Sequence, residues 1–528
     1  MWSLFLRVQV LRLLIRADVH AEGKTLMDKN RVPVLVGVGQ LVNREKTQDQ
    51  MDPLKMMTEA GRTAAKDACI SNLTKLDTLY VVNCLSKSFE NPCKELSEEL
   101  GCTPAETGYT GIGATAPQWL VNRVAERIYK GSSELALICG AEAFYTHGKT
   151  LSLYEAMLNF FAEGRSRAQS SYVGDMRVPF SVLEDQYGLV MPLTMYSLME
   201  NALRAHWNMS IEDHFRELCF FCARSSEIAS QNPFAWTRNA RTAEEIGTLN
   251  EKNRMVAFPY TKLMCSNMAV NQAAALIMTN LAKAEALGVP KDKIVFLRGF
   301  GDAEDVWLVS ERPDMWASPS VRVAVNQALD QIPLSIDEVE YLDFYSCFPC
   351  APRITREILD ISREDSRPLT ITGGMPAFGG PGNNYAMHAI CLMVTKLREN
   401  PESFGLVQAL SWYISKHSVG VYSGSPGEIT RIHDNKSHLK QKKEGYQPVN
   451  VLKEATGKAR VESYTVLYDR DSEPCAAIVI GREESDDRFI AKVKPGKNVL
   501  EQMTRKKVIG KRGKVEYDPT NATNWFYF

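Results

Sequence analysis

The chain has 528 residues, of which 45% are hydrophobic and 24% are charged, with 62 Lys and Arg against 63 Asp and Glu. This length exceeds what one hydrophobic core usually holds, so we expect two or three ordinary globular domains. The formal net charge of −1 excludes a nucleic-acid-binding field spread over the whole molecule, and no apolar run is long enough to span a bilayer. The twelve cysteines lack the paired spacing of a zinc site, so no metal site is predicted.

The first residues are rich in leucine and valine and carry Arg7, Arg12 and Arg16, with no acid before Asp18. An amphipathic start that is poor in acids is typical of a mitochondrial presequence. We therefore predict that 1–28 is a targeting or disordered segment and that the protein is mitochondrial, with a cytoplasmic or peroxisomal location as the alternative.

Strand and helix patterns alternate along the next part of the chain. Buried-strand patterns alternate with apolar residues at helical spacing, and several of the strands end in glycine. The predicted strands are 31–40, 76–84 and 135–140, and the predicted helices are 53–68 and 117–129. This order predicts a parallel α/β sheet.

The same order of elements returns later in the chain. The later strands are predicted at 294–301, 339–347 and 405–410, with a helix at 385–397. Gly37 and Cys84 are 47 residues apart, and Gly299 and Cys347 are 48 residues apart. We infer two similar α/β halves stacked on one another, the first at 29–285 and the second at 286–424.

Two further parts complete the predicted organisation. A stretch rich in Met, Phe and Tyr, at about 150–260, is too long for a connection and predicts an inserted subdomain with helices at 191–206 and 211–231. The tail at 435–528 predicts a small β-rich domain with a hairpin of 458–468 and 475–482 and a strand at 489–493.

The tail carries a cluster of basic residues. They are Lys492, Lys494, Lys497, Arg505, Lys506, Lys507, Lys511, Arg512 and Lys514. Such a cluster binds phosphate or single-stranded nucleic acid when aromatic side chains are interleaved with it. No clear aromatic platform accompanies the cluster in the sequence, so we expect a solvated face and no nucleic-acid partner.

The stretch 370–384 contains five glycines and two prolines directly before a predicted helix. A glycine-rich loop that opens a helix can present its backbone N–H groups to an anion or to an oxyanion. The alternative is a tight surface connection. Composition alone leaves both interpretations open.

Several stretches together resemble the thiolase superfamily over roughly 31–423, in particular the sterol-carrier-type thiolases and the type 1 thiolase-like proteins. The stretches are Asp185-Gln186-Tyr187-Gly188, Asn232-Pro233-Phe234-Ala235, Val270-Asn271-Gln272-Ala273-Ala274-Ala275, Asp343-Phe344-Tyr345-Ser346-Cys347-Phe348-Pro349 and the segment 412–423. The resemblance implies an acetyl-CoA acetyltransferase-like fold of two duplicated halves, layered α/β/α/β/α, with an inserted loop subdomain and an added C-terminal domain. It also implies acyltransferase chemistry in lipid metabolism and a possible homo-oligomer.

A thiolase of this superfamily uses a nucleophilic cysteine at a helix N-terminus, a histidine in a Gly-His-Pro turn, a second cysteine that moves a proton, and an Asn or His in an oxyanion hole. Carried over by position, these four places fall on Ala114, Gly380, Leu410 and Tyr345. Alanine, glycine and leucine have no group that can act as nucleophile, base or acid. The resemblance therefore implies a degenerate active site in which classical thiolase activity is weak or absent.

We expect the protein to bind CoA or an acyl-CoA as ligand or substrate, with no permanently bound cofactor. The ligand-binding residues expected are Gly113, Ala114, Tyr345, Ser346, Cys347, Gly379, Gly380, Pro381 and Trp412. One alternative is an active acyltransferase or thioesterase that uses Tyr345, Cys347 or His417, although Cys347 as a packed loop cysteine and His417 as a structural histidine are the plainer interpretations. A further alternative is a non-catalytic scaffold that acts through the C-terminal domain.

Overall fold

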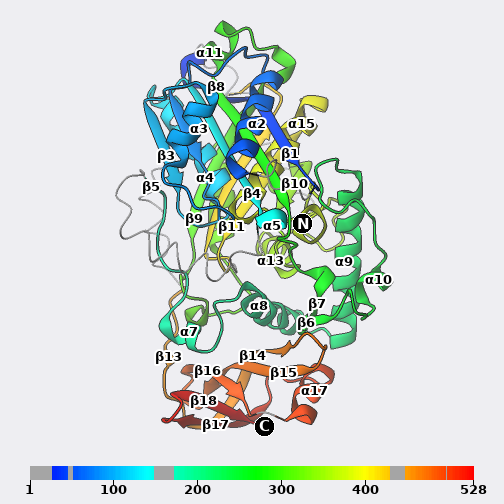
Figure 1. Cartoon of the computed structure of the whole chain (residues 1–528). Coiled ribbons are helices and arrows are strands. Elements are labelled where there is room, and N and C mark those ends of the chain that lie inside the picture. The colour runs from blue at the N-terminus through cyan, green and yellow to red at the C-terminus, as the bar shows by residue number, and fades with distance from the viewer. Residues whose placement is uncertain (1–26, 46–51, 148–171, 428–445, 495) are drawn as a thin grey trace, which may run out of the picture.

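Figure 1 shows a computed structural model of the chain, which describes residues 27–45, 52–147, 172–427, 446–494 and 496–528. Almost all of the predicted targeting segment lies outside the described residues, as does the start of the predicted insertion. The upper part of the molecule is an α/β body and the lower part is a separate β-rich domain. Among the described residues no helix is both long and apolar enough to cross a bilayer.

The first half of the body is a six-stranded sheet in the order β5–β3–β2–β4–β8–β1. Strand β2 runs parallel to β3 and β4, whereas β8 is antiparallel to both of its neighbours. The elements of this half are η1 (Lys29–Arg31), β1 (Pro33–Val42), α2 (Pro53–Asp67), β2 (Thr78–Val81), α3 (Pro92–Leu100), β3 (Glu106–Thr110), α4 (Ala116–Tyr129), β4 (Leu135–Ala143), α5 (Phe144–His147), β5 (Tyr172–Val173), β8 (Asn271–Asn280) and α11 (Leu281–Ala286).

The second half continues the sheet in the order β10–β11–β12–β9, and the halves meet where β9 pairs with β1. That pairing covers only Val34 opposite Phe296 and Leu35 opposite Val295. The elements are η4 (Lys291–Lys293), β9 (Val295–Glu304), η5 (Val309–Glu311), α12 (Ser320–Leu329), η6 (Ile336–Glu338), β10 (Tyr341–Phe344), α13 (Cys350–Ile358), α14 (Met375–Phe378), η7 (Gly382–Asn384), α15 (Tyr385–Glu399), β11 (Phe404–Ser411) and β12 (Lys416–Ser423). Strand β12 was missed by the sequence analysis, so His417 lies within a strand and not after the final one.

Helices α4 and α15 form the central layer of the body. They contact each other, and each contacts strands of both halves of the sheet. Their apolar side chains share one buried cluster with residues of β4, β8, β9 and β11. Helix α2 covers the outer side of the first half, and α12 covers the outer side of the second. The α/β/α/β/α layering that the family resemblance implied is therefore confirmed.

The duplication is visible in two pairs of glycines. Gly37 and Gly39 of β1 lie so close to α2 that an added Cβ would fall within 3.0 Å of the backbone of Ala60 and Ala64. In the second half, an added Cβ at Gly299 or Gly301 of β9 would meet backbone oxygens of α12 equally closely. Only glycine allows a strand and a helix to approach this closely. The two halves therefore share the same close packing of a glycine-containing strand against a helix, which agrees with their matching residue spacing.

The inserted subdomain places helices against the glycine-rich stretch and between the body and the C-terminal domain. Its elements are α7 (Val182–Gln186), α8 (Pro192–His206), α9 (Ile211–Gln231), α10 (Ala243–Gly247), β6 (Met255–Ala257), β7 (Tyr260–Thr261) and η3 (Lys262–Met264). Helices α8 and α9 agree with the predicted ranges to within one residue. Helix α9 packs so closely on the stretch that an added Cβ at Gly373 would meet Ala229 within 3.0 Å.

The C-terminal domain is a closed five-stranded barrel. Its strands are bonded in the ring β14–β15–β16–β18–β17 and back to β14. The elements are β13 (Val451–Leu452), β14 (Gly457–Tyr468), β15 (Pro474–Glu483), β16 (Arg488–Val493), α17 (Lys497–Arg505), β17 (Arg512–Asp518) and β18 (Thr523–Tyr527). The predicted hairpin is β14 and β15, whereas α17 and the last two strands were not predicted.

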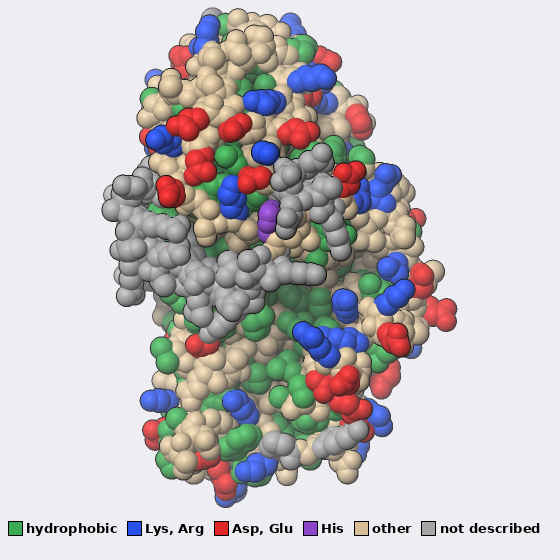
Figure 2. All heavy atoms as spheres, viewed as in Figure 1, with side chains coloured by type: hydrophobic (Ala, Val, Ile, Leu, Met, Phe, Trp, Pro, Cys, Tyr) green, Lys and Arg blue, Asp and Glu red, His purple; other side chains and the backbone are tan. Residues whose placement is uncertain are grey.

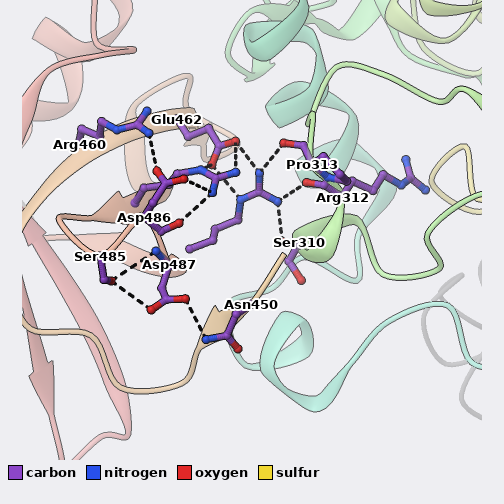
Figure 3. Close-up of polar contacts among 11 residues, drawn as sticks. Ser310, Arg312, Pro313, Asn450, Arg460, Glu462, Ser485, Asp486 and Asp487 are labelled. Atoms are coloured by element: carbon purple, nitrogen blue, oxygen red, sulfur yellow. Dashed lines mark hydrogen bonds and ion pairs between the residues drawn. The ribbon is translucent and has the colours of Figure 1, made fainter. Parts of the chain in front are cut away.

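A buried arginine joins the barrel to the body (Figure 3). Arg488 is fully buried, and its guanidinium bonds Glu462 of β14 at 2.8 Å through Nε and 2.5 Å through Nη2. On the other side it donates to the carbonyl oxygens of Ser310 at 2.8 Å and Pro313 at 3.1 Å, and to that of Arg312. A planar guanidinium with five donors suits such a divided set of acceptors.

Apolar and polar contacts with α8 complete the junction between the barrel and the body. The outward side chains of Ile478, Ile480 and Ile490 belong to the same buried cluster as residues of α8, α9 and α13. Ser463 Oγ donates to the carbonyl oxygen of Leu198 at 2.7 Å. Figure 2 shows hydrophobic side chains gathered at this level of the molecule, while charges of both signs are interspersed over the body above. The barrel is thus docked as an integral part of the chain.

We predict that Arg488→Met weakens this junction strongly, because Glu462 and three carbonyl oxygens lose their shared donor in a buried place. Breaking a buried ion pair from one side costs about 3–5 kcal/mol. Thermal and denaturant unfolding measure the loss, and limited proteolysis reports whether the barrel separates from the body.

Arg460→Ala is the matched control, because Arg460 pairs with Asp486 in the same region but both side chains are more than half exposed. An exposed pair contributes about 0–1 kcal/mol. Equal losses for the two variants would show that the burial of Arg488 is not what holds the junction.

Candidate functional site

The residues predicted from the family pattern lie in loops that converge at the start of the two central helices. Ala114 precedes α4, Gly380 precedes α15, and Tyr345 follows β10. Ala114, Tyr345, Cys347, Leu410 and Trp412 all belong to or pack against one apolar cluster, the cluster that also holds Met375 and Tyr385. The structure therefore brings the predicted positions together, from four separate parts of the chain.

Hydrogen bonds connect the converging loops. The N–H of Gly113 donates to Asn383 Oδ1 at 2.9 Å, and the N–H of Thr115 donates to Ser411 Oγ at 2.8 Å. Asn383 Nδ2 donates to the carbonyl oxygen of Asn83 at 3.0 Å. These bonds fix the N-terminus of α4 against the start of α15 and the end of β11.

The glycine-rich stretch uses its own amides. The N–H groups of its five glycines all donate to oxygen atoms of the chain. Gly373 donates to Thr370 Oγ1 and Gly374 to Thr372 Oγ1. Gly379 donates to the carbonyl oxygen of Met375, Gly380 to that of Asn267, and Gly382 to that of Gly380. A loop that cradles an anion needs N–H groups without such partners. In this conformation the stretch is held by its glycine amides and does not offer them to a ligand.

A buried carboxylate anchors the beginning of the stretch. Asp343 Oδ2 accepts hydrogen bonds from the N–H groups of Ile371 and Thr372 at 2.9 and 3.1 Å and from the hydroxyl of Thr370 at 2.9 Å. Burial raises the pKa of Asp343 to about 6, and these hydrogen bonds act in the opposite direction. Asp343 was not among the predicted site residues, although an acid inside the apolar strand β10 is a visible signal in the sequence.

The place of the family histidine is filled. An added Cβ at Gly380 would fall within 3.0 Å of Ser266 Oγ and of Met375 Cε. Real Cβ atoms do not come so close to other heavy atoms, so no side chain fits at 380 without movement of these neighbours. Both neighbours are ends of side chains, so a side chain at 380 would require Ser266 and Met375 to rotate away.

Two buried polar atoms beside these glycines have no hydrogen-bond partner among the described residues. They are Ser266 Oγ, next to Gly380, and Gln272 Oε1, next to Gly379. Gln272 is fully buried and its Nε2 donates to the carbonyl oxygens of Phe234 and Phe378, both at 3.0 Å. Native structures rarely leave buried polar atoms unpaired, so these two call for a donor from a water or a ligand. Neither residue was among the predicted site residues.

Cys347 is a poor candidate for a nucleophile. Burial of its thiol raises the pKa to about 12, and the hydroxyl of Tyr196 is its hydrogen-bond partner. Tyr345 beside it is also buried, and its ring meets Tyr385 edge to face at 5.3 Å between centroids. A reactive cysteine needs an electropositive environment that favours the thiolate, and this one is apolar.

His417 has its own partners. Its Nδ1 accepts from Gln408 Nε2 at 2.9 Å, and its Nε2 is 2.8 Å from Ser318 Oγ. Burial lowers the pKa of His417 to about 4. Both ring nitrogens are thus satisfied by groups other than Cys347. The arrangement is that of a structural histidine.

The large cavity lies on the other side of the α4 N-terminus. It has a volume of about 820 Å³ and is lined by Gly113, Thr115, Trp119, Trp307 and Lys416 among others. Five acidic residues also line it, namely Asp175, Asp302, Glu304, Asp305 and Glu311. This excess of acids does not suit the phosphates of a nucleotide. Of the ligand-binding residues predicted from the sequence, Gly113 alone lines this cavity.

Residues 439–520 match the family described as thiolase-like protein type 1 additional C-terminal domain. Among solved structures, a monomeric SCP2-thiolase like protein type 1 from Mycobacterium smegmatis is 30% identical, with a TM-score of 0.80 over 94% of this chain and 99% of that one. An Ltp2–ChsH2(DUF35) aldolase matches at 16% identity and a TM-score of 0.57, over 74% of this chain and 98% of that one. An acetyl-CoA acetyltransferase from Syntrophomonas wolfei matches at 16% identity and a TM-score of 0.54, over 75% of this chain and 99% of that one. The last two show the fold alone.

We predict that Gly380→Ala destabilises the protein by about 1–3 kcal/mol, the usual cost of adding a methyl group to a filled site. Denaturant unfolding measures it. The double variant with Ser266→Gly should lose less unfolding free energy than the sum of the two single variants, because the Ser266 hydroxyl that the added methyl group would meet is absent.

Gly61→Ala in α2 is the control, since its added Cβ would meet no atom closer than 3.4 Å. That change should be neutral or stabilising, because alanine favours a helix by about 1 kcal/mol over glycine. A neutral Gly380→Ala would contradict the filled site.

We predict that Cys347 escapes alkylation in the native protein. With a pKa of about 12, roughly one Cys347 thiol in ten thousand is ionised at pH 8, and that fraction grows only as the pH rises toward 12. Peptide mapping after iodoacetamide treatment should find Cys69 and Cys475, which are exposed, modified well before Cys347. Preferential labelling of Cys347 would instead favour a reactive site.

Proposed function

The chain belongs to the SCP2-thiolase-like protein type 1 family, and we propose that it binds an acyl thioester of CoA without the carbon–carbon bond chemistry of a thiolase. In this proposal the superfamily fold is retained as a binding scaffold.

The missing chemistry follows from side chains that cannot react. Thiolase chemistry needs a nucleophile to take the acyl group and a base and an acid to move protons. Ala114, Gly380 and Leu410 supply none of these groups. Tyr345 is buried, and burial raises its pKa well above the usual range, so its hydroxyl stays neutral and does not act as a base near pH 7. No substitute pair takes over, since Cys347 and His417 bond to different partners.

The observation that carries the binding half is the unpaired oxygen of Gln272. Leaving a buried acceptor unsatisfied costs about 1–3 kcal/mol, which a ligand donor would recover. The pantetheine arm of CoA carries amide N–H groups of this kind. Ser266 Oγ lies beside Gly380 and offers a second polar contact to the same ligand.

Two arginines near this point suit the phosphates of CoA. Arg44 donates to the carbonyl oxygens of Ala235 and Trp236, and the N–H of Trp236 donates to Phe378 just before Gly379. The pKa of Arg44 is lowered by partial burial and by the like charge of Arg238. Neither arginine forms an ion pair with another described residue. Two neighbouring guanidiniums without an acid attract a phosphate group, which would relieve their repulsion.

We predict that isothermal titration calorimetry detects CoA and acyl-CoA binding by the full chain. Gln272→Leu should remove the orphaned acceptor, and Arg44→Ser with Arg238→Ser should remove the phosphate contacts, each weakening binding at least tenfold, or about 1.4 kcal/mol. Mass spectrometry after incubation with acetyl-CoA should find no acyl adduct on the protein.

Arg62→Ser is the control for charge, because Arg62 is exposed on α2 and bonds only the carbonyl oxygen of Glu99 among the described residues. It should leave the affinity unchanged. Absence of heat at millimolar CoA and acyl-CoA would refute the binding proposal, and a covalent adduct on Cys347 would replace it with an acyltransferase or thioesterase.

A further inference from the structure

Positive charge is concentrated in one part of the C-terminal barrel. Residues 488–514 contain ten Lys and Arg against one acid, Glu501, whereas residues 446–487 contain five Lys and Arg against nine acids. The overall balance of the chain hides this segregation. Glu516 and Asp518 follow this basic stretch directly on β17, and Arg488 is buried and paired with Glu462, so the exposed excess of cations is smaller than the count.

The strand register places two aromatic side chains beside this basic stretch. Strand β18 lies between β16 and β17, and Trp525 is opposite Lys492 on one side and Glu516 on the other. Two residues along, Tyr527 is opposite Lys514. The intervening residues of the three strands, Val493, Val515 and Phe526, are buried in the barrel core. Trp525 therefore faces outward between Lys492 and Glu516, and Tyr527 faces outward beside Lys514.

This arrangement changes the expectation from the sequence. The aromatic residues lie more than 30 positions after Lys492 and Lys494 in the chain, but β18 brings them between those lysines and β17. Lys494 Nζ lies 5.1 Å from the centre of the Trp525 ring. A sequence scan for interleaved aromatics cannot find a platform that only strand pairing assembles.

The polar edges of both rings are held by neighbouring acids. Trp525 is hydrogen-bonded to Asp518, and Tyr527 to Glu516, which also pairs with Lys514 at 2.5 Å. Rings fixed at one edge lose little conformational freedom when a flat ligand stacks on them. Glu516 is at the same time the one repulsive group for an anionic ligand beside Tyr527.

The usual ligand face of such a barrel is not free. Five-stranded barrels of the OB type bind oligonucleotides or oligosaccharides on the face of their second and third strands. Those strands are β15 and β16 here, and their outward Ile478, Ile480 and Ile490 are packed against the body. Figure 1 draws β17 and β18 at the lower end of the molecule, away from the body, whereas β16 carries Arg488 and Ile490 of the junction before it reaches Lys492.

We propose that the outward face formed by Lys492, Lys494, Trp525, Tyr527 and Lys514 binds single-stranded nucleic acid, with bases stacked on the two rings and phosphates on the lysines. Aromatic stacking platforms flanked by cations are how proteins hold single strands without regard to sequence. The charge and the flat aromatic faces favour this occupant over a neutral sugar chain. The face is separate from the site proposed for CoA.

Fluorescence anisotropy with labelled 15-nucleotide DNA and RNA oligomers tests the proposal on the full chain at 50 mM salt. Trp525→Leu should weaken binding about tenfold or more, which is the usual contribution of one stacked base. The double variant Lys492→Gln with Lys494→Gln should weaken binding. It should also make the slope of log K against log salt concentration shallower by about 0.7 for each phosphate contact that is lost. Glu516→Gln should strengthen binding, because it removes a negative charge beside Tyr527. A misfolded variant would bind more weakly, so a gain in affinity cannot result from misfolding.

Lys283→Gln is the matched control, because Lys283 on α11 of the body loses the same charge far from the barrel. It should leave both the affinity and the salt dependence unchanged. Absence of binding by the wild-type protein, equal weakening by the control, or weaker binding by Glu516→Gln would overturn the proposal. So would a preference for vesicles of anionic lipid over the oligomers, which would assign the face to a membrane surface.

Discussion

One asparagine holds the two central helices in register. Asn383 accepts the N–H of Gly113 at the start of α4 and donates to Asn83, which follows β2 in the first half, while Asn383 itself lies in η7 directly before α15. Because a duplicated fold meets itself at these helix starts, a bond at this point fixes how the two halves face each other. The convergence of Ala114, Gly380 and Leu410 follows from it. The amide of Asn383 is buried, so its hydrogen bonds are worth more than they would be in water.

The residues at the starts of the two central helices form a closely packed site. Ser266 and Met375 lie where a side chain at Gly380 would go, the glycine amides donate within the chain, and the rings of Tyr345 and Tyr385 pack edge to face. These features favour rigidity over proton transfer, since a general base needs both a titratable group and room for a substrate. The oxygens Gln272 Oε1 and Ser266 Oγ have no partner among the described residues, and the binding proposal rests on them.

The C-terminal barrel changes the chain from a bare thiolase-type body into a two-part molecule. Its attachment combines apolar contacts with a buried guanidinium, so that Arg488 specifies the orientation while Ile478, Ile480 and Ile490 supply the buried apolar area. A buried charge tolerates few alternative arrangements, because every other one leaves it unpaired. Docking in this way covers one outer face of the barrel and leaves the basic aromatic face of β16, β18 and β17 in solvent.

The sequence by itself determined the α/β class, the duplicated order of elements, helices α8 and α9 and the first barrel hairpin, because periodicity and glycine spacing are local signals. It also gave a prediction of where the four superfamily positions fall, on residues without the reactive groups of a thiolase. Tertiary structure alone decided that Ser266 blocks Gly380, that Gln272 lacks a partner, and that Trp525 lies among lysines. These facts depend on contacts between residues that are distant in the chain, and no local pattern records which side chains a fold brings to within hydrogen-bond distance.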